Sequence, residues 1–217
     1  KSDNGLLTTI AYQIEGKDPL YALEGSVPIA GAAVQWLRDN LNIIKSSDEI
    51  ESLAMGEKDN GDVYFVPAFS GLFSPHWDET ARGALFGLTR FSNKSHIARS
   101  VLESVAFQSF ELLQSMEKDL DIEFQNLKVD GGMVSNNLLM QFQSDILNKT
   151  IISQEINEIT ALGAGVASFI FAEHLNIKNV GDFISTSKTW NPNMSNESRE
   201  NLLASWFKAI EKAKHWL

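Results

Sequence analysis

The 217-residue sequence contains no cysteine and few histidines. Without thiols the chain can form neither disulfide bonds nor thiolate metal sites, and nothing points to an oxidising compartment. The spacing of the histidines is not typical of metal ligands. They are His76, His96, His174 and His215. We therefore expect no metal site within this chain.

Long apolar runs are also missing. The longest, ALGAGVASFIFA at residues 161–172, is too short and too rich in glycine to span a bilayer. The first residue is Lys1 rather than methionine, and no signal peptide is visible. We expect a cytoplasmic protein with no membrane partner.

Basic residues are scarce relative to acidic ones. Lysine and arginine number 18 against 28 aspartate and glutamate, which gives a formal net charge of −10. Such a surface repels nucleic-acid phosphates, so we expect no nucleic-acid partner. A local site for an anionic nucleotide stays open, because backbone N–H groups and helix ends can supply positive potential.

The apolar residues that are present make up 43% of the chain, which is enough to form a core. Residue patterns predict strands at 5–12, 20–25, 61–69, 126–132 and 150–155. They predict helices at 26–44, 46–59, 95–116, 136–148, 160–175 and 195–217, the first with Ser26 as N-cap. The repeated strand-then-helix order after residue 126 indicates an α/β fold with parallel neighbours in its sheet. No linker divides the chain.

The segment VDGGMVSNN, residues 129–137, joins one predicted strand to the next helix. It lacks the third glycine of the dinucleotide fingerprint and the Gly-Lys-Ser/Thr of a P-loop. Two adjacent glycines remove Cβ atoms where a planar base or a ribose could lie against the backbone. Asn136 could then cap the helix or donate to a ligand. Taken alone, the segment fits a tight turn as well as a ligand site.

Two further windows of small residues carry the same ambiguity. In ITALGAGVAS, close helix packing is the favoured reading of Gly165, and Gly163 could lie near a nucleotide. In PIAGAAVQ, Gly31 lies one turn before Gln35, and a glycine inside a helix costs roughly 0.5–1 kcal/mol relative to alanine. That cost is consistent either with helix packing or with a ligand. If the three windows converge, they outline one glycine-lined cleft.

Three acidic residues are candidates for chemistry, and each has a structural interpretation. Asp78 lies near Arg82 in a loop, where an ion pair is the favoured role. Glu103 lies within a predicted apolar helix and requires a buried partner, and Asp130 ends a strand where turn capping is common. No Ser/His/Asp set or carboxylate pair follows from the spacing. We name no catalytic residue in this chain.

The segment GALFGLTRFSNKSHIARSVLES, residues 83–104 with Glu103 as its acidic residue, resembles the second signature of the FGGY carbohydrate kinases. Four other segments resemble, in the same order, the members of that family that phosphorylate glycerol. They are YALEGSVPIAGAAVQWLRD, YFVPAFSGLFSPHWD, VDGGMVSNNLLMQFQSDIL and TALGAG. His76 departs from the pattern, since the family usually has tyrosine there.

The resemblance implies an α/β fold of the ribonuclease-H-like, actin-like ATPase class, with a mixed sheet flanked by helices. It assigns residues 1–217 to the C-terminal, nucleotide-binding lobe, without its first strands and without the N-terminal lobe. By residue-for-residue match, Gly132 and Asn136 would contact the adenosine of ATP or ADP, and Gly31 and Gln35 would also face the nucleotide. The Mg²⁺ ligands, the catalytic base and both phosphate loops would precede Lys1.

The implied reaction transfers the γ-phosphoryl group of MgATP to glycerol. A kinase for another polyol or sugar, such as xylulose, is the alternative within the family, because most substrate contacts would lie upstream. A non-catalytic nucleotide-binding regulator is the alternative from another class. Family members often form dimers and tetramers, and the oligomeric state stays open.

Overall fold

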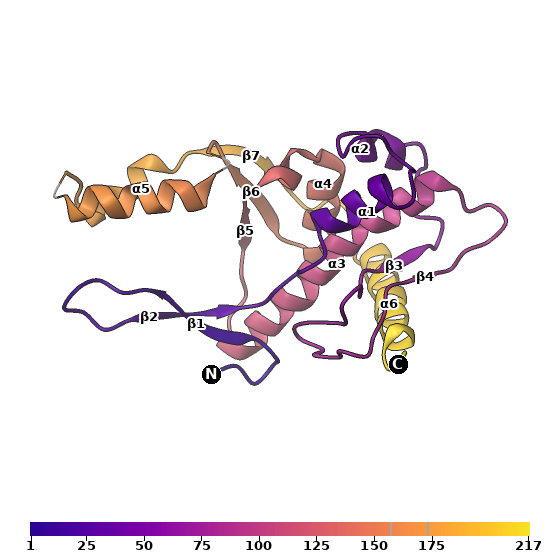
Figure 1. Cartoon of the computed structure of the whole chain (residues 1–217), viewed down its shortest axis with the longest axis horizontal. Coiled ribbons are helices and arrows are strands. Elements are labelled where there is room, and N and C mark those ends of the chain that lie inside the picture. Colours follow the sequence, from indigo (N-terminus) through magenta and orange to yellow (C-terminus); the bar gives the residue numbers. More distant parts are fainter. Residues whose placement is uncertain (157, 173) are drawn as a thin grey trace.

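The computed structural model describes residues 1–156, 158–172 and 174–217. Figure 1 shows a long central helix, α3 (Lys94–Leu120), with α1 (Gly31–Asp39), α2 (Glu49–Ala54) and α4 (Asn137–Leu147) gathered around one part of it. Helix α6 (Asn196–Ala213) lies beside α3, next to β3 (Tyr64–Val66) and β4 (Ala84–Phe86). The remaining elements are β1 (Leu7–Tyr12), β2 (Leu20–Glu24), β5 (Asn126–Val129), η1 (Gly132–Ser135), β6 (Thr150–Gln154), α5 (Ile159–Phe171), η2 (Ile177–Phe183) and β7 (Thr186–Trp190).

Helix α3 organises the core because its apolar side chains contact several other elements. Its N-terminus is capped by Asn93, whose Oδ1 accepts from the N–H groups of Ser95 and His96. In its middle, the Phe107 ring stacks on Trp206 of α6 with ring centroids 5.0 Å apart, and meets Phe142 of α4 edge-on at 5.5 Å. The three rings join α3, α4 and α6.

The strands form a three-stranded sheet and two separate pairs. In the sheet, β5 and β6 are parallel, as the sequence predicts, and β7 is antiparallel to β6, so the sheet is mixed. β1 pairs with β2 as one antiparallel hairpin, and β3 pairs with β4 as another. Neither β4 nor β7 was predicted, because GALFG lies among turn residues and TSKTW is largely polar and exposed.

The predicted helix at 26–44 is wrong at both ends. Helix α1 begins at Gly31 after Ala30, which makes no side-chain cap, so Ser26 is not the N-cap. Pro28 disfavours helical geometry at Val27, which keeps residues 26–28 outside the helix. At the other end α1 stops at Asp39, and Asn42 has a positive φ of 53°.

The β1–β2 hairpin and α5 extend away from the α3 core (Figure 1). Their apolar side chains are exposed, with Ile10, Tyr21 and Phe169 each more than half accessible. A Cβ placed on Gly165 would meet no atom within 4 Å, so the helix packing predicted for Gly165 is wrong for this chain. None of the described helices combines the length and apolar character needed to cross a bilayer.

Candidate nucleotide cleft

A cleft of about 450 Å³ lies between α1, α2 and the start of α4. Its volume is within the range of typical small-molecule sites. All four residues predicted to face the nucleotide line it: Gly31, Gln35, Gly132 and Asn136. Segments about one hundred residues apart in the sequence therefore meet at one surface, so two of the three glycine windows converge. The third does not, because Gly163 is not among the residues that line the cleft.

Local structure explains how the four residues reach the cleft. Gly31 is the first residue of α1, and Gln35 follows one turn later, so both lie on one face of the helix. Gly132 opens the 3₁₀ turn η1, which follows β5. Asn136 is the N-cap of α4, and its Oδ1 accepts from the Leu139 N–H at 2.8 Å. The capping role predicted for Asn136 is confirmed, and its amide NH₂ group donates no hydrogen bond among the described residues.

The reason for glycine differs between the two adjacent positions, 131 and 132. Gly131 has a φ of 87°, which L side chains rarely adopt, so the turn requires glycine there. Gly132 lies outside that region of φ, and a Cβ built on it would meet no atom within 4 Å. Neither backbone conformation nor packing within the described chain requires glycine at 132. The absence of a side chain at Gly132 leaves open space in the cleft.

Sequence reasoning missed the acidic side of the cleft. Ser47, Asp48 and Glu51 line it, from α2 and the residues before it. Glu51 Oε1 accepts from the Leu138 N–H at 2.8 Å, which ties α2 to the start of α4. The run SSDEIES predicts a short helix, but its polar residues occur on every side of that helix. The pattern alone could not single out Glu51.

Glu103 is a buried structural carboxylate, as the sequence favoured. Its Oε1 accepts from Arg99 Nε and its Oε2 from Asn60 Nδ2, both at 2.9 Å. Burial raises the pKa of the Glu103 carboxyl to about 7, while the hydrogen bond from Arg99 lowers it. Its neighbour Leu102 lines the nucleotide cleft, so the network anchors helix α3 directly behind that wall.

The ion pair predicted between Asp78 and Arg82 is wrong. Arg82 donates instead to the carbonyl oxygens of Glu79 and Ala81. The Asp78 carboxylate accepts from the Thr80 hydroxyl at 2.6 Å and from the His215 N–H at 3.0 Å. These hydrogen bonds lower the Asp78 pKa to about 2, and the bond from the Thr80 hydroxyl has the largest effect. Asp78 therefore holds its own turn and the C-terminal residues, and the Asp78 oxygens are better placed for backbone N–H donors than for the arginine.

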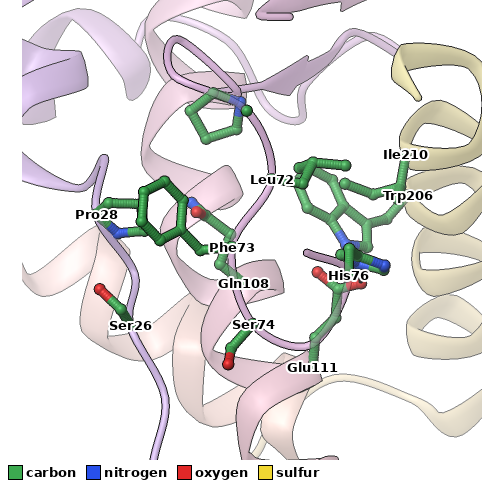
Figure 2. A pocket seen from close by; sticks show the side chains of 12 residues that line it. Ser26, Pro28, Leu72, Phe73, Ser74, His76, Gln108, Glu111, Trp206 and Ile210 are labelled. Atoms are coloured by element: carbon green, nitrogen blue, oxygen red, sulfur yellow. Dashed lines mark hydrogen bonds and ion pairs between the residues drawn. The ribbon is translucent and has the colours of Figure 1, made fainter. Parts of the chain in front are cut away.

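A second cavity, between the loop at 71–76, α3 and α6, is too small for a substrate. Figure 2 shows His76 beside Glu111, with Trp206 and Gln108 also lining the cavity. The distance from His76 Nε2 to Glu111 Oε1 is 2.6 Å, and both side chains are largely buried. The cavity volume of about 20 Å³ suits one water molecule. His76 thus replaces the tyrosine of the resembling family with a polar contact to α3.

Metal ligands are not gathered in the part of the chain that the structure describes. There, no group of three or more His, Asp or Glu side chains lies close enough together to hold an ion. Asp130, at the end of β5, is exposed. The cleft therefore offers glycine backbone, amides and the carboxylates of Asp48 and Glu51 to a ligand.

Comparison with known proteins gives a consistent result. The profile of the C-terminal domain of the FGGY family of carbohydrate kinases matches residues 1–171. The glycerol kinase of Brucella anthropi is 51% identical over 217 residues, and that of Methylobacterium radiotolerans is 50% identical over 218. These alignments cover 100% and 99% of this chain, but only 44% and 43% of those relatives.

Solved structures agree. The crystal structure of Plasmodium falciparum glycerol kinase with ADP superposes with a TM-score of 0.88 at 36% identity, covering 98% of this chain and 42% of that one. Xylulose kinase from Rhodospirillum rubrum has a TM-score of 0.78 at 21% identity, over 98% of this chain and 43% of that one. The predicted fold class is confirmed: a ribonuclease-H-like lobe of the actin-like ATPase type, α/β, with a mixed sheet flanked by helices.

Proposed function

The chain belongs to the FGGY family of carbohydrate kinases, and we propose that it forms the nucleotide-binding lobe of an ATP-dependent glycerol kinase. The reaction would transfer the γ-phosphoryl group of MgATP to glycerol, giving glycerol 3-phosphate and ADP. The observation that carries the proposal is the convergence of Gly31, Gln35, Gly132 and Asn136 on one cleft. Relatives about 50% identical are glycerol kinases, which favours glycerol over other acceptors.

In this proposal the cleft holds the adenosine of ATP. The open space at Gly132 would admit the planar base or the ribose against the backbone, and the amide groups of Gln35 and Asn136 would supply polar contacts. From the family resemblance, we assign Mg²⁺, the catalytic base and the phosphate loops to a preceding lobe. The described residues hold no group of three or more side chains that could bind a metal ion. Closure of the two lobes would then align the phosphates and exclude water.

We also propose that the lobe lacks its first strands in this chain. The β1–β2 hairpin and the β5–β6–β7 sheet are separate, which leaves one edge of β1 and one edge of β5 unpaired within the described residues. Exposed apolar side chains on the hairpin, such as Leu7, Ile10 and Tyr12, are what an incomplete sheet would leave uncovered. An upstream strand between the two edges would complete the sheet.

The composition of the chain bears on its cellular location. We propose a cytoplasmic enzyme, because the chain has no cysteine and an acidic surface. Glycerol and ATP or ADP are its proposed partners, with no role for nucleic acid or membrane. We propose a homodimer or a tetramer, because members of the family often form such assemblies.

Acceptor dependence is the direct test of the activity. We expect ADP release by the full-length gene product to rise strongly when glycerol is added, and to stay near the no-acceptor level with xylulose. Release that depends on xylulose or another polyol would keep phosphoryl transfer but replace the substrate. No acceptor-dependent release, with ATP still bound, would favour a non-catalytic regulator and contradict the proposal.

Affinity of the isolated chain tests how the lobe works. We expect residues 1–217 alone to bind ATP with a Kd on the order of a millimolar, about −4 kcal/mol, because only adenosine contacts would remain. Isothermal titration calorimetry against the full-length protein would measure the difference. A Kd below about a micromolar for the isolated chain would mean that phosphate contacts also lie within it.

A further inference from the structure

Glu51 connects the two walls of the nucleotide cleft. Its Oε1 accepts from the Leu138 N–H at 2.8 Å, across 87 residues of sequence. Leu138 is the second residue of α4, so its N–H is one of those that the helix itself cannot satisfy. The next N–H, from Leu139, goes to Asn136. The start of α4 is thus held by two side chains, one from its own segment and one from α2.

This bond fixes the geometry of the cleft as well as the end of a helix. One wall carries Gly31 and Gln35 on α1 and leads on to α2, and the other carries Gly132 and Asn136. Among the described residues, Glu51 makes the one side-chain hydrogen bond that joins α2 to α4. Asn136 lies two residues before the N–H that Glu51 accepts, so a shift of Leu138 moves Asn136 with it.

We propose that Glu51 is a positioning residue of the nucleotide cleft. By holding Leu138, it keeps Asn136 and Gly132 at the distance from Gln35 that the adenosine requires. The proposal rests on the proposed nucleotide-binding function and adds to it a side chain on the acidic wall. The carboxylate also suits the partial positive charge at the N-terminus of α4. A role limited to capping would stabilise α4 without affecting the affinity for nucleotide.

The test compares substitutions at Glu51 in the full-length protein. Glu51→Ala removes the acceptor, and we expect the KM for ATP to rise about fivefold to tenfold, with kcat at saturating ATP changed less than about twofold. Glu51→Gln retains a carbonyl oxygen that can accept from Leu138, and we expect it to restore most of the affinity. If Glu51→Ala cannot be purified, Glu51→Asp serves, because its side chain is one methylene too short to keep the bond.

A matched control separates positioning from capping. Ser195 caps α6 by accepting from the Ser198 N–H at 3.2 Å, and it does not line the cleft. We expect Ser195→Ala to lower the melting temperature as Glu51→Ala does, while leaving the KM for ATP unchanged. An unchanged KM in Glu51→Ala, or equal effects of Glu51→Gln and Glu51→Ala, would overturn the proposal.

The nucleotide cleft and the positioning role of Glu51 can be disproved separately. If the wild-type protein binds ATP and Glu51→Ala binds it equally well, positioning by Glu51 is wrong and the nucleotide cleft stands. If the wild-type protein binds no nucleotide, measured by calorimetry with ATP and with ADP, both the nucleotide cleft and the role of Glu51 are overturned.

Discussion

Replacing Gly132 by valine should weaken nucleotide binding at least tenfold, about 1.4 kcal/mol, while leaving the fold unchanged. Gly132 opens η1 on the wall of the cleft. A Cβ there would meet no protein atom within 4 Å, so the added side chain has room in the ligand-free protein. The same side chain would project into the space that the adenosine is proposed to fill.

The contrast with Gly131 makes the prediction specific. At Gly131 the φ of 87° penalises any side chain, so a substitution there would change the turn and confuse a folding defect with a binding defect. At Gly132 no such strain applies. A loss of affinity in Gly132→Val would therefore report on the ligand rather than on the backbone.

Competition of ATP against a fluorescent nucleotide, in the full-length protein, would measure the loss, with Gly132→Ala expected to fall between wild type and valine. Asn137→Val is the matched control, because it places the same side chain in the same segment at an exposed position outside the cleft. Unchanged affinity in Gly132→Val, with the protein folded, would show that the adenosine lies elsewhere.

The sequence indicated which residues belong to the cleft more reliably than it indicated where the elements begin. Gly31 could be singled out because a glycine predicted inside a helix costs stability, and Gly132 because two adjacent glycines remove Cβ atoms where a ligand could lie against the backbone. Their convergence depends on how α1 and α4 pack against α3, which the resemblance supplied and residue patterns did not. Ser26 shows the limit, since this plausible cap is followed by Pro28 and the helix begins only at Gly31.

Long-range hydrogen bonds account for most of what could not be predicted. Glu51 reaches Leu138 and Asp78 reaches His215, each across many residues, and no local spacing encodes either pairing. The strand β7 is similar, because its pairing with β6 determines its conformation while its own residues are mostly polar. The packing predicted for Gly165 was wrong for a different reason: no atom of the described chain lies within 4 Å of a Cβ built there.

Replacing Glu103 by alanine should cost about 3–5 kcal/mol of unfolding free energy, because it leaves Arg99 and Asn60 without their buried acceptor. Arg99 also donates to the Glu57 carbonyl at 3.0 Å, so the network joins α3 to the loop before β3. Urea unfolding followed by tryptophan fluorescence would measure the loss. Glu200→Ala, at an exposed position on α6, is the control and should change stability by less than about 0.5 kcal/mol.

The same carboxylate should make stability depend on pH near neutrality. Its pKa in the folded protein is about 7, above the usual 4.5 of a glutamate, because burial disfavours the charged form. A raised pKa means that the folded state binds the proton more tightly, so this contribution is complete below about pH 4.5 and is lost as the pH rises through 7. This rise in the pKa of Glu103 corresponds to about 3 kcal/mol of unfolding free energy. Glu103→Gln cannot titrate, so its unfolding free energy should fall less than that of the wild type between pH 5 and pH 8. Parallel curves for the two proteins would show that Glu103 is ionised throughout this range, held so by Arg99.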